Sequence, residues 1–163
     1  MKSILLIRHA KSSWDFNVED FDRPLNERGK KAAPEMANRL LKKDIKIDVF
    51  ISSPALRALT TAKYFADVYK VNKDHIIEVD ALYEPTSSAL ENAIKSQDDA
   101  HETIALFSHN PGITEFAARL SATRIDEMPT CAIFAIKAAI NGWSDFKSAG
   151  NEFWFFDYPK SGL

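Results

Sequence analysis

Six short apolar runs, spread along the whole chain, limit what this sequence can fold into. They are rich in β-branched and aromatic residues and comprise Ser3–Ile7, Ile47–Ile51, Ile76–Val79, Thr103–Phe107, Ala132–Ile136 and Phe153–Phe156. Their hydrophobicity is largely continuous and does not alternate with polar residues, which is typical of strands covered on both faces. The pattern therefore predicts a buried sheet with a layer of structure on each side.

Amphipathic stretches separate the first four runs. In the first stretch Asn26 is a candidate N-cap, and apolar residues three and four positions apart from Ala33 to Leu41 indicate one buried helix face. Pro34 lacks a backbone N–H, so we expect it to kink this helix or to mark its effective start. Further helices are expected at 55–69, at 87–95 and after the Asn-Pro-Gly sequence at 110–112.

Strands that alternate with helices indicate a mainly parallel sheet with helices on both faces. The chain has 163 residues, of which 45% are hydrophobic, and this is enough to form one core. Its sequence contains no internal repeat, low-complexity segment or domain linker. We therefore expect an α/β protein with a single domain over residues 1–163.

In such a sheet, ligands bind at the carboxyl ends of the strands. The residues expected at this rim are Arg8 and His9 after the first run, Ser52 and Arg57 after the second, Glu84 after the third and His109 after the fourth. Two arginines and two histidines would then meet, with no carboxylate expected at their centre. Arginine binds phosphate oxygens two at a time, and the amino end of the helix after Pro54 adds partial positive charge. The sequence therefore predicts an anion site suited to phosphate.

His9 is the leading candidate for a nucleophile in this site. The ordinary pKa of an imidazole is about 6.5, so the free base is available at neutral pH, and a neighbouring arginine favours the uncharged form. A phosphoryl group in transfer spreads negative charge over its equatorial oxygens. We therefore expect Arg8, Arg57 and His109 to bind and stabilise that group.

Three other kinds of site are disfavoured. The histidines are not at metal-ligand spacing and the arginines would repel a divalent cation, so we expect no metal. No Gly-rich turn ending in Lys-Ser or Lys-Thr follows the first run, which argues against a nucleotide-binding loop. Ser12, Ser13 and Ser52 lack the Gly-x-Ser-x-Gly elbow of a serine nucleophile. We expect no cofactor.

The composition limits the partners. A net charge of −2 and a pI near 6.1 argue against nucleic acid as a partner. Cys131 cannot form a disulfide within the chain, and its apolar surroundings predict a small buried residue in a strand. The first run is too short for a signal peptide and no run has membrane length, so we expect a cytoplasmic protein without a membrane partner. The oligomeric state stays open, with a monomer as one option.

Four motifs together resemble a known family. They are "IRHAKSSW…FDRPLNERG", "SSPALRALTTA", "LYEP" and "FSHNPGI", and in order and spacing they are similar to the histidine phosphatase superfamily, most closely to its small SixA-type phosphohistidine phosphatases. The resemblance spans about residues 2–120. It implies a three-layer α/β/α sandwich of the phosphoglycerate mutase-like type, here in a minimal version without a lid domain, and it implies catalysis without a metal.

The resemblance also implies roles for individual residues. His9 would become transiently phosphorylated, and Arg8, Arg57 and His109 would be phosphate ligands. The family's acid, where it is present, falls on Glu84. The usual Gly after the Arg-His pair is Ala10 here, which bears on the geometry of the loop and not on the chemistry.

The sequence leaves little room for the insertions that build specificity pockets in mutases and sugar bisphosphatases. An open site suits a phosphorylated protein side chain such as phosphohistidine, whose P–N bond breaks with modest help from an acid. The loop after His9 carries Lys11, Trp14, Asp22 and Arg23, and we assign Lys11 and Ser52 to substrate binding. A small phosphorylated substrate hydrolysed by a broad phosphomonoesterase, or a non-catalytic module that binds phosphate or a phosphoprotein, are the alternatives. The tail "EFWFFDYPKSGL" is expected to supply a last strand, with a partner-binding aromatic patch as the other interpretation.

Overall fold

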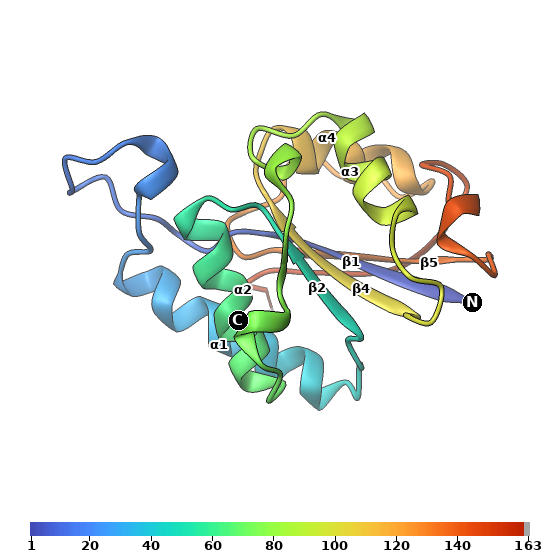
Figure 1. The fold of residues 1–163 in the computed structure, drawn as a ribbon, viewed down its shortest axis with the longest axis horizontal. Helices are drawn as coiled ribbons and strands as arrows, with labels where there is room; N and C mark the ends of the chain where they lie inside the picture. Colours follow the sequence, from blue (N-terminus) through green and yellow to red (C-terminus); the bar gives the residue numbers. More distant parts are fainter. Residues whose placement is uncertain (162–163) are drawn as a thin grey trace.

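A computed structural model describes residues 1–161, and its strands alternate with helices along most of the chain (Figure 1). The strands are β1 (Lys2–Arg8), β2 (Val49–Ser52), β3 (Ile77–Glu78), β4 (Thr103–Ser108), β5 (Ile133–Ala138) and β6 (Glu152–Asp157). The helices are α1 (Glu27–Lys42), α2 (Leu56–Val68), α3 (Ser87–Lys95) and α4 (Gly112–Leu120). Four short 3-10 helices lie at Asp20–Asp22, Lys73–His75, Asp80–Leu82 and Trp143–Asp145. The expected order of strands and helices is confirmed, and residues 162 and 163 of the predicted tail strand lie outside the described part.

The six strands form one mixed sheet in the order β3-β2-β4-β1-β5-β6. The pairs β1 with β4, β4 with β2 and β2 with β3 are parallel, whereas β5 runs antiparallel to both β1 and β6. The prediction of a mainly parallel sheet is therefore confirmed. Strand β1 lies between β4 and β5, so its backbone is hydrogen-bonded on both edges.

Each face of the sheet is covered by a pair of helices, α1 and α2 on one side and α3 and α4 on the other (Figure 1). Alternate residues of β1 point to opposite faces. Ile4 and Leu6 join the core under α3 and α4, and Leu5 and Ile7 join the core under α1 and α2. The continuous hydrophobicity of the first run therefore serves two cores, as the sequence pattern indicated.

Helix α1 begins where the sequence predicted but does not break at its proline. The side chain of Asn26 accepts a hydrogen bond of 2.9 Å from the backbone N–H of Gly29 and so caps the helix. Pro34 lies inside the helix, which continues to Lys42, so the expectation that Pro34 marks the effective start of the helix is wrong. Pro34 is only half-buried, and the helix packs through Ala33, Met36, Ala37 and Leu40. Burial of that apolar face compensates for the one hydrogen bond that proline removes.

Two smaller expectations are also wrong. Strand β3 has only two residues, both exposed at the edge of the sheet, so the run at 76–79 is not covered on both faces along its whole length. Cys131 is buried as predicted, but it precedes β5 in a left-handed turn with a φ of 62°.

Two glycines allow helix ends to approach the loops that follow the strands. A Cβ on Gly29 would lie 2.2 Å from the carbonyl oxygen of Lys11, and one on Gly112 would lie 2.2 Å from that of Pro85. Both contacts are to backbone, so neither neighbour can simply rotate away. These glycines bring the first turns of α1 and α4 against the segments after β1 and β3. No helix of the described residues is long and apolar enough to cross a membrane.

We expect Gly29→Ala to lower the free energy of unfolding by about 1–3 kcal/mol, because the added methyl group collides with the Lys11 backbone. The higher helix propensity of alanine would on its own raise that free energy by about 0.5–1 kcal/mol. Urea denaturation measures the difference, with Lys30→Ala, an exposed neighbour on the same helix, as the control. A gain in stability for Gly29→Ala would show that the two backbones are not in close contact.

Candidate active site

His9 is held by the backbone on both sides. Its N–H donates to the carbonyl of Ser108 at 3.2 Å, and its own carbonyl accepts from the N–H of Cys131 at 2.9 Å. The next residue is fixed by α2, since the Ala10 N–H donates to Thr61 Oγ1 at 2.9 Å and that hydroxyl donates to the Arg57 carbonyl at 2.7 Å. The loop after β1 therefore has a defined position relative to β4, β5 and α2.

The hydrogen bonds of His9 determine its tautomer. Its Nδ1 lies 2.7 Å from the carbonyl oxygen of Ala10, and a carbonyl can only accept. Nδ1 therefore carries the proton, and Nε2 carries the lone pair. This is the form of imidazole that a nucleophile at Nε2 requires.

Burial keeps the His9 ring neutral. The residue is 6% exposed, and its pKa is lowered to about 3, first because burial penalises the imidazolium and then because Arg57, Arg8 and Arg23 repel it. The hydrogen bond to Ala10 acts in the opposite direction and is outweighed. The sequence predicted a neutral imidazole, but it attributed the effect to a neighbouring arginine, whereas desolvation contributes most.

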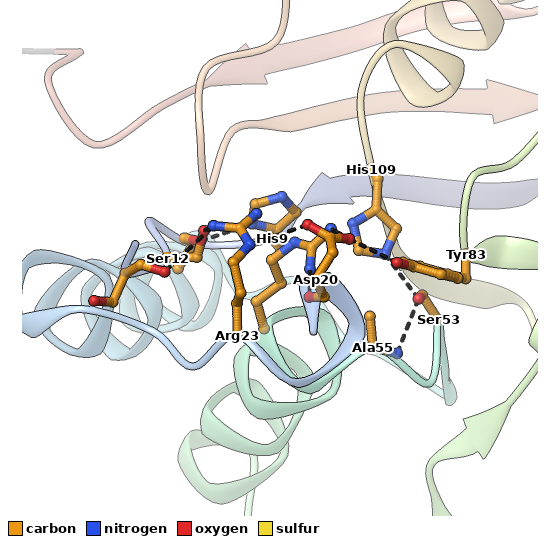
Figure 2. Close-up of polar contacts among 11 residues, drawn as sticks. His9, Ser12, Asp20, Arg23, Ser53, Ala55, Tyr83 and His109 are labelled. Carbon is orange, nitrogen blue, oxygen red and sulfur yellow. Dashed lines mark hydrogen bonds and ion pairs between the residues drawn. The ribbon is translucent and has the colours of Figure 1, made fainter. Parts of the chain in front are cut away.

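His109 follows β4 and lies next to His9, with 5.1 Å between the ring centroids. Its Nε2 is 2.7 Å from Ser53 Oγ, which in turn accepts from the Ala55 N–H at 3.2 Å. Burial, followed by the proximity of His9 and Arg57, lowers the pKa of His109 to about 3. Both imidazoles are therefore uncharged at neutral pH. Figure 2 shows His9 and His109 side by side, with Ser53 and Tyr83 beyond His109.

The two arginines of the rim are anchored to backbone oxygens. Arg8 Nη1 donates to the Met128 carbonyl at 2.9 Å, and Arg57 Nη1 donates to the Asp20 carbonyl at 2.7 Å. Within residues 1–161, the buried side-chain nitrogen and oxygen atoms without a hydrogen-bond partner are Arg8 Nε, Arg57 Nε and His109 Nδ1. Buried polar atoms are usually paired, so their concentration in three of the predicted site residues is informative. The geometry offers these nitrogens to a further group.

A carboxylate that the sequence did not predict lies beside Arg57. Asp20 accepts hydrogen bonds from Tyr83 Oη at 2.6 Å, from Arg23 Nε at 3.0 Å and from Arg57 Nη2 at 3.1 Å. The hydrogen bond from Tyr83 is the largest reason that its pKa falls to about 2, and both arginines contribute. Asp20 therefore adds a half-exposed carboxylate beside a site for which the sequence required none. Arg57 is ion-paired within the chain itself, with Asp20, which Figure 2 labels near its centre.

Asp20 reaches the site because the loop at residues 11–25 folds back over it. Arg23 is buried, donates to Ser12 Oγ at 2.8 Å and lies 3.5 Å from the centre of the Trp14 ring. Trp14 itself is 77% exposed. In Figure 1 the loop projects from the layers as a dark blue arm that carries the Asp20–Asp22 turn.

Three further residues were predicted to belong to the site, namely Ser52, Glu84 and Lys11. Ser52 is fully buried and its hydroxyl donates to the Ser53 carbonyl at 2.8 Å, so the structure brings Ser53 and not Ser52 to His109. Glu84 is exposed on the segment after β3, next to Tyr83, with a φ of 53°. Lys11 is exposed and belongs to the lining of a separate pocket beside α1.

Sequence reasoning missed Asp20, Ser53 and Tyr83. Ser53 and Tyr83 belong to the motifs after β2 and β3, so their positions next to Ser52 and Glu84 were a usable signal. No comparable signal marks Asp20, because its role depends on how the loop folds. Within residues 1–161, no group of three or more His, Cys, Asp or Glu side chains is placed to hold a metal ion.

Solved structures share this fold over nearly the whole chain. The protein histidine phosphatase SixA complexed with tungstate matches with a TM-score of 0.82 at 20% identity, over 96% of this chain and 97% of that one. A SixA protein from Agrobacterium tumefaciens matches with a TM-score of 0.80 at 22% identity, over 97% of this chain and 98% of that one. The expected phosphoglycerate mutase-like sandwich, without a lid domain in the described residues, is thereby confirmed.

The chain is also similar in sequence to other proteins, one of which is a phosphatase. An uncharacterized chloroplastic protein of Arabidopsis thaliana is 30% identical over 153 residues, which make up 88% of this chain and 70% of that protein. Phosphoserine phosphatase 1 of Hydrogenobacter thermophilus is 37% identical over 87 residues, which cover 49% of this chain and 40% of that enzyme. Residues 4–85 match the sequence model of the histidine phosphatase superfamily, branch 1. With about half of its length in that match and His9 and Arg57 inside it, the chain belongs to the histidine phosphatase superfamily.

Proposed function

We propose that the protein is a phosphatase that works through a phosphohistidine at His9, and that its substrate is phosphohistidine on another protein. The observation that carries the first part is the neutral Nε2 of His9 beside the unpaired nitrogens of Arg8, Arg57 and His109. A nucleophile and a set of cationic and neutral donors in one place are what phosphoryl transfer requires.

The proposed reaction has two steps. The Nε2 lone pair attacks phosphorus, the bond from phosphorus to the leaving group breaks, and the leaving group takes up a proton. Water then attacks the phosphorus of phosphohistidine, releasing inorganic phosphate and restoring the neutral ring. Arg8 and Arg57 would neutralise the charge on the equatorial oxygens in both steps, so the reaction needs no metal.

His109 would act as a neutral donor in this scheme. When the Ser53 hydroxyl donates to Nε2, the proton of His109 lies on Nδ1, which is one of the unpaired buried atoms. Nδ1 can then donate to a phosphoryl oxygen without the cost of a buried imidazolium. Ser53 is thus a positioning residue, because it acts by fixing the tautomer of His109.

Asp20 competes with the substrate for Arg57. A phosphoryl group bound to Arg57 Nη2 would take the place of the Asp20 carboxylate, which now makes that contact at 3.1 Å. Because Asp20 belongs to a surface loop, the carboxylate can move outward when a phosphoryl group enters. The ion pair therefore lowers the affinity for an anion that has to displace the carboxylate from Arg57.

The choice of substrate rests on the leaving group and on the relatives. A solved structure with this fold is named as a protein histidine phosphatase, which supports phosphohistidine, and the site is bordered by an exposed loop and not by a lid. The alternative is a phosphomonoesterase for small molecules, which the 37% identity to a phosphoserine phosphatase favours. An alcohol leaving group needs a proton donor, and Glu84 would have to supply it.

The nucleophile is tested by phosphorylation with labelled phosphoramidate. We expect an acid-labile, base-stable adduct on His9, and a loss of turnover of at least about 10³-fold in His9→Ala. His75→Ala, which removes an exposed histidine, should leave both unchanged. An excess of chelator should also have no effect. Phosphate binding without adduct or turnover would instead support a non-catalytic module.

The substrate class is tested with Glu84→Gln. We expect little change on a phosphohistidine peptide, because its P–N bond breaks with modest help, and a loss of about 10²-fold on a phosphomonoester if Glu84 is the acid. Steady-state kinetics on both substrates give the comparison, with Glu78→Gln on the exposed edge strand as the control. Equal losses on both substrates would show that Glu84 does not act as the proton donor.

The competition by Asp20 is tested with Asp20→Asn. Loss of the carboxylate frees Arg57 and Arg23, so inorganic phosphate should inhibit about two- to fivefold more strongly, the range expected for one partly exposed ion pair. Asp22→Asn, two residues away in the same turn, makes the same change in charge without that contact and should not alter inhibition. An unchanged or weaker inhibition in Asp20→Asn would mean that the carboxylate helps to build the anion site.

A further inference from the structure

A second pocket lies beside the active site, on the α1 side of the loop after β1. Its volume is about 490 Å³, and it is formed by the first half of α1, by residues 129–130 before β5 and by residues 158–160 after β6. The four cationic residues that line it are Lys11, Arg28, Lys31 and Lys160. A pocket of this volume is large enough for a ligand or a short peptide segment.

The pocket carries a net positive charge. None of its four cations forms an ion pair with a carboxylate of residues 1–161. Glu35 is the acidic residue of its lining, and the carboxylate is paired with Arg39 at 2.9 Å. Arg39 also holds the opposite wall, because it donates to the carbonyl oxygens of Tyr158 and Pro159 at 2.9 and 2.8 Å. The one acid is therefore neutralised by a residue that also fixes the shape of the pocket.

The pocket begins close to the nucleophile. Lys11 is two residues from His9, so their Cα atoms are at most about 7 Å apart. On the other side Thr130 precedes Cys131, whose N–H donates to the His9 carbonyl at 2.9 Å. Two of the residues that line the pocket are thus close in sequence to His9 or to its backbone partner, which brings the pocket within reach of a chain bound at the active site.

We infer that this pocket binds an acidic segment of the phosphorylated protein, next to the side chain that is dephosphorylated. The inference rests on the proposed function and adds what the enzyme would recognise besides the phosphoryl group. Carboxylates of the segment would pair with Lys11, Arg28 and Lys31, and its apolar parts would contact Ala32, Pro129 and Tyr158. Such rim charges raise the rate of encounter and favour partners of opposite charge.

A peptide segment fits better than a small anion because the other border of the active site is apolar. Trp14, Phe16 and Val18 of the loop are 77%, 59% and 47% exposed. Exposed apolar side chains on a loop that reaches the site through Asp20 are typical of protein–protein contacts, and a small anion would leave them uncovered. Arg23 stacks on Trp14 and orients it before any partner arrives.

The test uses two phosphohistidine peptides of equal length, one flanked by Glu and Asp and the other by Gln and Asn, together with phosphoramidate. The variant is Arg28→Gln with Lys31→Gln, and the control is Lys42→Gln with Lys63→Gln, which removes two exposed lysines outside the pocket. Glutamine keeps the helix propensity and avoids new repulsion with Glu27 and Glu35.

We expect the unmodified protein and the control to prefer the acidic peptide by about fivefold or more in kcat/KM. In the variant this preference should fall by about fivefold, because KM for the acidic peptide rises while kcat stays the same. High salt should reduce the preference in the unmodified protein, in the control and in the variant. The rate on phosphoramidate should be the same in the unmodified protein, the variant and the control.

Two results would overturn the inference: no preference in the unmodified protein, or a preference that survives in the variant. A loss in the variant on all three substrates would also overturn it, because the cations would then act on the phosphoryl group itself. Failure of phosphoramidate to label His9 in the unmodified protein would refute the proposed function instead.

Discussion

The position of His9 depends on two backbone hydrogen bonds, one to the end of β4 and one to the turn that precedes β5. The Ser108 carbonyl accepts from its N–H and the Cys131 N–H donates to its carbonyl, so His9 continues the hydrogen bonding of β1 beyond the last strand residue. The proposed role of His9 as a nucleophile would require its ring to be held within a fraction of an ångström of the line of attack, and a strand bonded on both edges provides that rigidity. The side-chain bond to Ala10 then fixes the tautomer, so one short segment sets both the location of Nε2 and its chemical state.

Desolvation has two consequences in this site. It lowers the pKa of both histidines, which keeps them neutral beside Arg8 and Arg57, and it makes an unpaired donor costly. The site meets that cost only in part, through Met128, Asp20 and Ser53, and leaves three nitrogens unpaired. These unpaired donors lower the stability of the fold, and an anion that accepts hydrogen bonds from them would raise it. Unpaired buried donors of this kind are common in functional sites.

Most of the fold could be predicted because it follows from periodicity. The continuous apolar runs placed all six strands to within about two residues, and the spacing from Ala33 to Leu40 identified the buried face of α1, whereas Leu41, expected on the same face, is exposed. Where the prediction failed, a local rule was outweighed by packing, as at Pro34, or the edge position left part of an apolar run exposed, as at β3. Neither outcome is encoded in the few residues around those positions.

The sequence by itself determined which chemistry is available. The functional side chains end a strand, follow one or begin a helix, and parallel topology brings such positions to one rim. These residues are Arg8, His9, Arg57 and His109. Only the tertiary structure decided how these groups are charged and paired. Asp20 meets Arg57 across 37 positions and Tyr83 across 63, and Ser53 meets His109 across 56. Contacts between segments so far apart depend on the course of loops and on burial, and neither has a period that can be read along the chain.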